Sequence, residues 1–258
     1  MTPPERRSPP SEEARSAGGT SERGEREDGP DAGIDLGVVV ARSPEGEPDA
    51  LESFADRIAG DAADELSSVT ASTWRAHVTE PAPLADGRTR RPSAFFDEAA
   101  LRMVEGPYDL IAVVTDVPLV SRRQRLVPGL ASPIGRVVVV STRKLLVGPR
   151  DEPIRSLSSD AVRWNATTLL LHLLGHVLGA GHRTADGGVM EPFEFDPARR
   201  RPPSFDADVS GHLRRIATRV PDEAVSRGPL RRLAFHVSSA WRNAGKVLRA
   251  LVHSRAPL

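Results

Sequence analysis

The sequence predicts an α/β (α+β) domain preceded by a polar tail and followed by further helices. Two observations support this fold class. Short β-branched runs alternate with longer segments of helical periodicity. The apolar content of 39% is almost entirely aliphatic, because aromatic residues make up only 4% of the chain. The length of 258 residues fits one domain of moderate size with tails, or two small domains.

The predicted elements follow the order β-α-β-α-β-β, and a long apolar helix comes next. Residues 34–41 are β-branched and short, which is typical of a buried strand, whereas 49–68 carry apolar residues at helical spacing. The remaining predicted elements are a strand in 69–80, a loop at 81–93, a helix at 94–105, strands in 108–119 and 136–145, the long helix at 159–179, and helices at about 205–219 and 229–253.

Four segments are expected along the chain. Residues 1–32 contain almost nothing large and apolar after Met1, so we interpret them as a disordered N-terminal tail. The main domain is expected at 33–195, a Pro- and Arg-rich linker at 196–204, and a basic helical segment at 205–258.

Composition excludes several classes of protein. Lys+Arg and Asp+Glu are both 35, so the net charge is +0, and we expect no nucleic-acid partner, since dedicated nucleic-acid binders are usually basic. The absence of cysteine excludes disulfides, thiolate catalysis and cysteine-ligated metal centres. No run approaches the roughly 18 apolar residues of a membrane span, and the N-terminus lacks the apolar core of a secretory signal. We therefore expect a cytoplasmic location, and the Arg- and Ala-rich composition indicates a GC-rich bacterial genome.

The informative stretch is His172-Leu-Leu-Gly-His176-Val-Leu-Gly179-Ala-Gly-His182. A helix places His172 and His176, four residues apart, on one face. Gly179 can adopt a left-handed backbone conformation and end that helix, so that the chain turns back and brings His182 to the same point. Three converging imidazoles predict a Zn²⁺ site with an open fourth position. The alternative is a Leu-rich core helix with incidental histidines, but three histidines within 11 residues of an apolar run are hard to satisfy without a shared partner.

This stretch resembles the metzincin zinc-protease signature, H-E-x-x-H-x-x-G-x-x-H followed by a methionine turn. Met190 lies eight residues after His182, and every position of the pattern matches except the glutamate, which is Leu173. The order of strands before the helix is most similar to archaemetzincins, over roughly residues 33–195. The resemblance implies a metzincin-like domain with a twisted mixed sheet, a backing helix and a zinc-site helix. It also implies that strand 136–145 lines the substrate cleft and that Met190 forms an apolar floor beneath the metal. Archaemetzincins carry cysteines beyond the third histidine, and this chain has none, so a second, structural zinc is not expected.

The missing glutamate decides the expected function. In the family, that carboxylate takes a proton from the attacking water and passes it to the leaving amine, and its loss removes typically 10²–10⁴-fold in rate. No acidic residue lies between Asp160 and Asp186, and the acids beyond the motif are Asp186, Glu191 and Glu194. The hypothesis is a degenerate metzincin-type protein with one zinc site, a pseudopeptidase that still binds a peptide or protein in its cleft. Two alternatives stay open: an active zinc metallopeptidase (a hydrolase) with an atypical general base, and a non-catalytic interaction or membrane-peripheral protein.

Other residues carry weaker signals. His77 belongs to no ligand spacing and is interpreted as structural, and Asp116 is interpreted as a turn residue that could alternatively orient a zinc-binding histidine. After Glu223 no acidic residue occurs, while basic and apolar residues recur at helical spacing through 227–255. Such a segment can lie on an anionic membrane surface or dock on an acidic partner, or it can pack on the domain.

Overall fold

The computed structural model describes residues 33–79, 82–121, 125–147, 155–183 and 187–220. The predicted N-terminal tail, the predicted helix at 229–253 and Asp186 lie outside the described residues.

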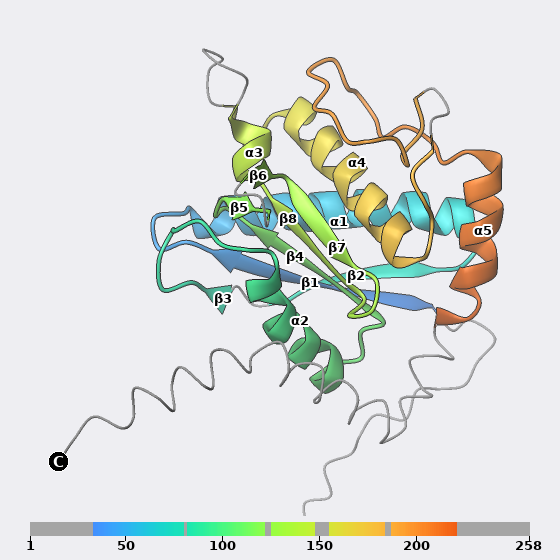
Figure 1. The fold of residues 1–258 in the computed structure, drawn as a ribbon, viewed down its shortest axis with the longest axis horizontal. Coiled ribbons are helices and arrows are strands. Elements are labelled where there is room, and N and C mark those ends of the chain that lie inside the picture. The colour runs from blue at the N-terminus through green and yellow to red at the C-terminus, as the bar shows by residue number, and fades with distance from the viewer. Residues whose placement is uncertain (1–32, 80–81, 122–124, 148–154, 184–186, 221–258) are drawn as a thin grey trace, which may run out of the picture. The chain divides into compact units, whose positions relative to one another are not determined.

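The described chain forms a mostly parallel sheet with helices on both faces (Figure 1). The strands are β1 (Ile34–Arg42), β2 (Trp74–Val78), β3 (Ala82–Pro83), β4 (Leu110–Thr115), β5 (Leu119–Val120), β6 (Leu126–Val127), β7 (Gly129–Ser132) and β8 (Val137–Ser141). The helices are α1 (Pro48–Thr70), α2 (Ser93–Glu105), α3 (Arg143–Leu146), α4 (Asp160–Val177) and α5 (Ala207–Ala217).

The main sheet has the order β2-β1-β4-β8-β7, with β3 paired to β1. All of its pairings are parallel except that of β7, which runs antiparallel to β8 and ends the sheet. This is the mixed α/β sheet that the sequence predicted. β5 and β6 form a separate antiparallel pair.

Two apolar clusters hold the layers together. Alternate residues of β1 point to opposite faces, so that Val38 and Val40 join the larger cluster, whereas Val39 joins the smaller one. α1, α4 and α5 contribute to the larger cluster and α2 to the smaller one. The central strands β4 and β8 are buried along their whole length, as expected for parallel strands covered on both faces.

Several predicted boundaries shift for physical reasons. Strand 136–145 is wrong beyond Ser141, because β8 pairs with β4 only as far as Thr115, and the chain then turns into α3. The predicted strand 69–80 begins only at Trp74, since α1 continues to Thr70 and ends at Ala71, which has a left-handed φ of 55°. β7 was not predicted at all, and it forms the edge of the sheet next to β8.

The described residues after the predicted linker share the larger apolar cluster with α1 and α4. Phe205, Val209 and Leu213 are buried in the larger cluster, together with residues of α1 and α4. Among the described helices, none is both long and apolar enough to cross a membrane.

Candidate metal centre

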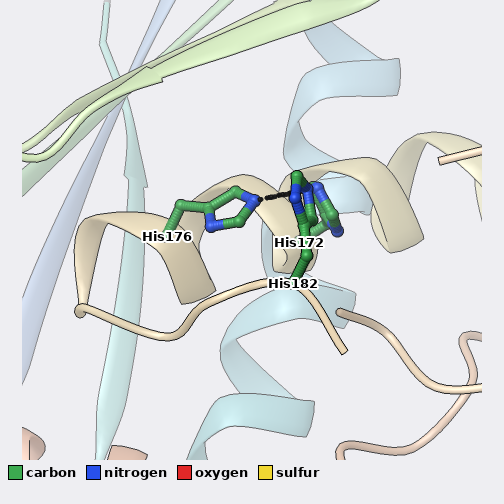
Figure 2. Close-up of side chains that lie close together, drawn as sticks. All are labelled: His172, His176 and His182. Atoms are coloured by element: carbon green, nitrogen blue, oxygen red, sulfur yellow. Dashed lines mark hydrogen bonds between the residues drawn. The ribbon is translucent and has the colours of Figure 1, made fainter. Parts of the chain in front are cut away.

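The three histidines of the motif converge at the C-terminal end of α4 (Figure 2). His172 and His176 lie one turn apart on the helix, and His182 reaches back from the segment that follows it. The Nε2 atom of His176 lies 3.1 Å from the Nε2 atom of His172 and 3.1 Å from that of His182. Among the described residues, these three histidines form the convergent group of candidate metal ligands, and the group includes no carboxylate.

This donor set fits zinc. Zinc–imidazole bonds of about 2.0–2.1 Å in a tetrahedron place neighbouring ligand nitrogens roughly 3.3 Å apart. The observed separations of 3.1 Å are close to that value. His172 is buried, His176 half-buried and His182 exposed, so the open side of the group faces solvent on the His182 side. The group is a site for one zinc ion.

The turn after α4 has the geometry that returns the chain to the site. Gly179 has a φ of 86°, its N–H donates to the carbonyl of His176, and the N–H of Ala180 donates to that of Gly175. These two bonds make a Schellman motif, in which a left-handed residue just past the helix satisfies carbonyls of the last turn. The motif reverses the chain, and His182 follows three residues after Gly179.

Backbone carbonyls orient two of the imidazoles. The Nδ1 atom of His172 lies 2.8 Å from the carbonyl oxygen of Val189, and that of His176 lies 2.9 Å from the carbonyl oxygen of Ala180. Because a carbonyl only accepts, each Nδ1 carries the proton and each Nε2 presents its lone pair to the shared point. The sequence carries no signal for these partners, since every residue has a carbonyl.

Burial keeps His172 in the form that binds metal. The pKa of His172 lies below its ordinary value mainly because burial disfavours the imidazolium ion, and the neighbouring imidazoles of His176 and His182 act in the same direction. The hydrogen bond with Val189 opposes this shift only in part. A neutral imidazole is the metal-binding form.

Met190 lies beneath the helix that carries the histidines. Its side chain is buried, and a Cβ atom added at Gly175 would lie 2.5 Å from its sulfur. Gly175 therefore allows Met190 to pack directly against the α4 backbone between His172 and His176. The N–H of Arg183 donates to the carbonyl of Met190, which joins the third histidine's segment to the methionine turn.

Leu173 lies on a neighbouring face of α4. It is 6% exposed, and its Cδ1 atom would lie 2.8 Å from a Cβ atom at Gly129 of β7. The side chain thus packs against the edge strand, and only a glycine at position 129 leaves room for it.

The other described residues singled out from the sequence are not part of the convergent group. Asp116 accepts hydrogen bonds from the N–H and the hydroxyl of Ser43, which ties the ends of β4 and β1 together, so it acts as a turn residue. The Nε2 atom of His77, on β2, lies 3.0 Å from the Oδ1 atom of Asp35, on β1. Glu191 accepts the N–H of Gly187 at 2.7 Å within its own loop, and Glu194 is exposed.

The fold that carries the three imidazoles is archaemetzincin-like. Two solved structures carry this similarity. The archaemetzincin of Methanopyrus kandleri is 23% identical, with a TM-score of 0.54, over 72% of this chain and 97% of that one. A zinc-dependent peptidase of Methanocorpusculum labreanum is 18% identical, with a TM-score of 0.50, over 68% of this chain and 99% of that one. No protein-family model and no curated protein matches the sequence. At these identities the similarity shows the fold, which the sequence motif had predicted.

Proposed function

We propose that this chain is a zinc-binding pseudopeptidase that retains a peptide-binding edge. The single observation that carries the proposal is Leu173, a buried hydrocarbon side chain on the helix that carries two of the three imidazoles. The archaemetzincin-like fold and the three converging imidazoles support the zinc-binding part.

The chemistry of peptide hydrolysis explains why one side chain matters so much. A bound zinc ion supplies Lewis acidity, which polarises a carbonyl group and acidifies water. An amine leaves only when it receives a proton, and that step needs a positioned acid. Position 173 holds leucine, and among the described residues the convergent group contains no carboxylate. We therefore expect a rate lower by roughly 10²–10⁴-fold or more than that of an enzyme with both groups.

The edge strand β7 supports the peptide-binding part. The N–H of Ser141 donates to the carbonyl of Pro128, so these residues face each other at a hydrogen-bonded position of the ladder, where proline can only accept. Antiparallel pairs alternate, so Leu130 also pairs through hydrogen bonds with β8, whereas the N–H of Ala131 is directed away from β8. An extended peptide can use such outward groups to add a strand.

Metal analysis of the full chain tests the zinc site. We expect about one zinc per chain in the wild type and a large loss in His176→Ala. His77→Ala is the matched control, because it removes a half-exposed histidine that belongs to no convergent group. Failure of the wild type to bind zinc after refolding with the metal contradicts the proposal.

Cleavage of a peptide library tests the missing base. We expect no chelator-sensitive turnover by the wild type and a gain of turnover in Leu173→Glu. Leu173→Gln is the matched control, since it carries the same loss of apolar burial, about 2 kcal/mol, without a carboxylate. Chelator-sensitive turnover by the wild type that His176→Ala abolishes would instead establish an active metallopeptidase with an atypical base.

Capture of peptides from the same library tests the edge strand. Ala131→Pro removes the outward N–H without removing a hydrogen bond to β8, and we expect it to weaken peptide capture. Ser132→Ala, which keeps the backbone donor, is the control. Equal capture by both variants contradicts strand addition at β7.

A further inference from the structure

His212 of α5 contacts the turn between the second and third histidines. Its Nε2 atom lies 3.0 Å from the carbonyl oxygen of Leu178, the residue that caps α4. Because a carbonyl only accepts, Nε2 donates this hydrogen bond. A Cβ atom at Gly179 would lie 3.3 Å from the same nitrogen, so the imidazole covers the left-handed residue of the turn.

This contact satisfies a group that the helix itself leaves open. The last carbonyls of a helix have no partner within the helix. In α4, the Schellman motif uses the carbonyls of Gly175 and His176, and His212 uses that of Leu178. The conformation of this turn sets the direction in which the chain leaves α4, and therefore the position of His182.

α5, which carries the His212 imidazole, is packed into the core and capped at its start. Leu213, the next residue, is 0% exposed, and Val209 and Ala217 are buried in the same cluster as α4. The side chain of Asp206 accepts the N–H of Val209 at 2.7 Å and caps the start of the helix. Burial on both sides of His212 thus fixes the backbone from which the imidazole reaches the turn.

We propose that His212 is a positioning residue for the metal centre, which holds the turn at Leu178–Gly179 so that His182 meets the other two imidazoles. The proposal rests on the proposed zinc binding. It assigns His212 no direct contact with the metal, since its Nε2 atom is bonded to Leu178. His212 acts on the metal centre through the backbone of the turn, in the way that other groups orient metal ligands without touching the metal.

Zinc affinity, measured by competition with a chromophoric chelator, tests the proposal. We expect His212→Ala to bind zinc about tenfold or more weakly than the wild type, in line with the loss of other supporting groups. His212→Gln places an amide N–H near the position of Nε2, and we expect it to recover most of the affinity. His77→Ala is the matched control and should leave the affinity unchanged.

The visible spectrum of the Co²⁺-loaded protein adds a readout of ligand geometry. We expect altered absorption bands in His212→Ala and bands close to the wild type in His212→Gln. A His212→Ala variant with a lower Tm but wild-type zinc affinity and an unchanged Co²⁺ spectrum would overturn the proposal, because the contact would then serve folding alone. A wild type that binds no zinc would refute the proposed function itself, so the two failures are distinguishable.

Discussion

Asn165 joins α4 to the segment that follows the methionine turn. It is 0% exposed, and its Nδ2 atom donates to the carbonyls of Ala161 and Asp196, both at 2.7 Å. Its Oδ1 atom accepts the N–H of Asp196 at 2.9 Å and the Nε–H of Arg199 at 3.2 Å. Three of these four bonds connect the helix to residues 196–199.

Replacing Asn165 with alanine removes all three connections at once. Each is worth about 0.5–1.5 kcal/mol, so we expect the free energy of unfolding to fall by about 3 kcal/mol. For a domain of this size, 1 kcal/mol shifts Tm by about 2–4 °C, so the expected loss in Tm is roughly 6–12 °C. Asn165→Asp should lower Tm as well, because an oxygen then faces the carbonyls of Ala161 and Asp196 in place of the donor.

Thermal and denaturant unfolding of the metal-free protein measures this effect. Thr168→Ala is the matched control, because within the described part of the chain the hydroxyl of Thr168 donates to the carbonyl of Trp164 in the same helix. If Asn165→Ala lowers Tm no more than Thr168→Ala does, the three bonds do not stabilise the fold and the reasoning fails.

Two further predictions concern the methionine turn and residues 224–258, which contain basic residues and no acidic one. Gly175→Ala should lower Tm, because its Cβ atom would lie 2.5 Å from the sulfur of Met190. This clash outweighs the helix preference of alanine over glycine, which is about 1 kcal/mol. Gly60→Ala in α1 is the control: its Cβ atom would meet nothing within 4 Å, so it should be neutral or raise Tm. We also expect deletion of residues 224–258 to reduce co-sedimentation with liposomes that contain anionic lipid, since each basic residue near such a surface contributes about 1 kcal/mol. Equal sedimentation with and without this segment would dismiss a role at the membrane.

The elements with strong local periodicity could be predicted from the sequence. The predicted helix at 49–68 corresponds to α1, and the predicted helix at 159–179 corresponds to α4. β1 was also predicted, because a run of β-branched residues is typical of a strand buried on both faces. In these segments, local preference and tertiary burial favour the same structure.

β7 was not predicted because its residues fit the close contact with α4 and have little strand preference of their own. Its residues Gly-Leu-Ala-Ser contain nothing β-branched, and the small Gly129 and Ala131 lie on the face that α4 covers. A side chain larger than hydrogen at position 129 would meet Leu173, so the close approach of α4 selects a residue with low strand preference. α3 was missed because the predicted strand 136–145 continues through its first residues. β8 stops at Ser141, where its pairing with β4 also ends, and this end depends on the length of β4.

The candidate site was only partly visible in the sequence. Spacing alone indicated that His172, His176 and His182 could share one point. Spacing could not reveal the contacts that support this site: the carbonyls of Val189 and Ala180, the hydrogen bonds of Asn165, and the contact of His212 with Leu178. His172 and His176 bond to backbone carbonyls, which every residue carries, whereas Asn165 and His212 bond across 31 and 34 positions of the sequence.

The structure also explains how metal binding and catalysis can separate on one helix. The imidazoles of His172 and His176 are oriented by two backbone carbonyls, and the turn after α4 brings His182 to them. Leu173 takes part in none of these contacts, because it faces β7 instead. A change from glutamate to leucine at this position would therefore remove a proton acceptor and leave the supports of the three nitrogens in place. Under the proposed function, a missing general base would therefore leave the zinc site intact, and zinc affinity and peptide cleavage have to be measured as independent properties of this chain.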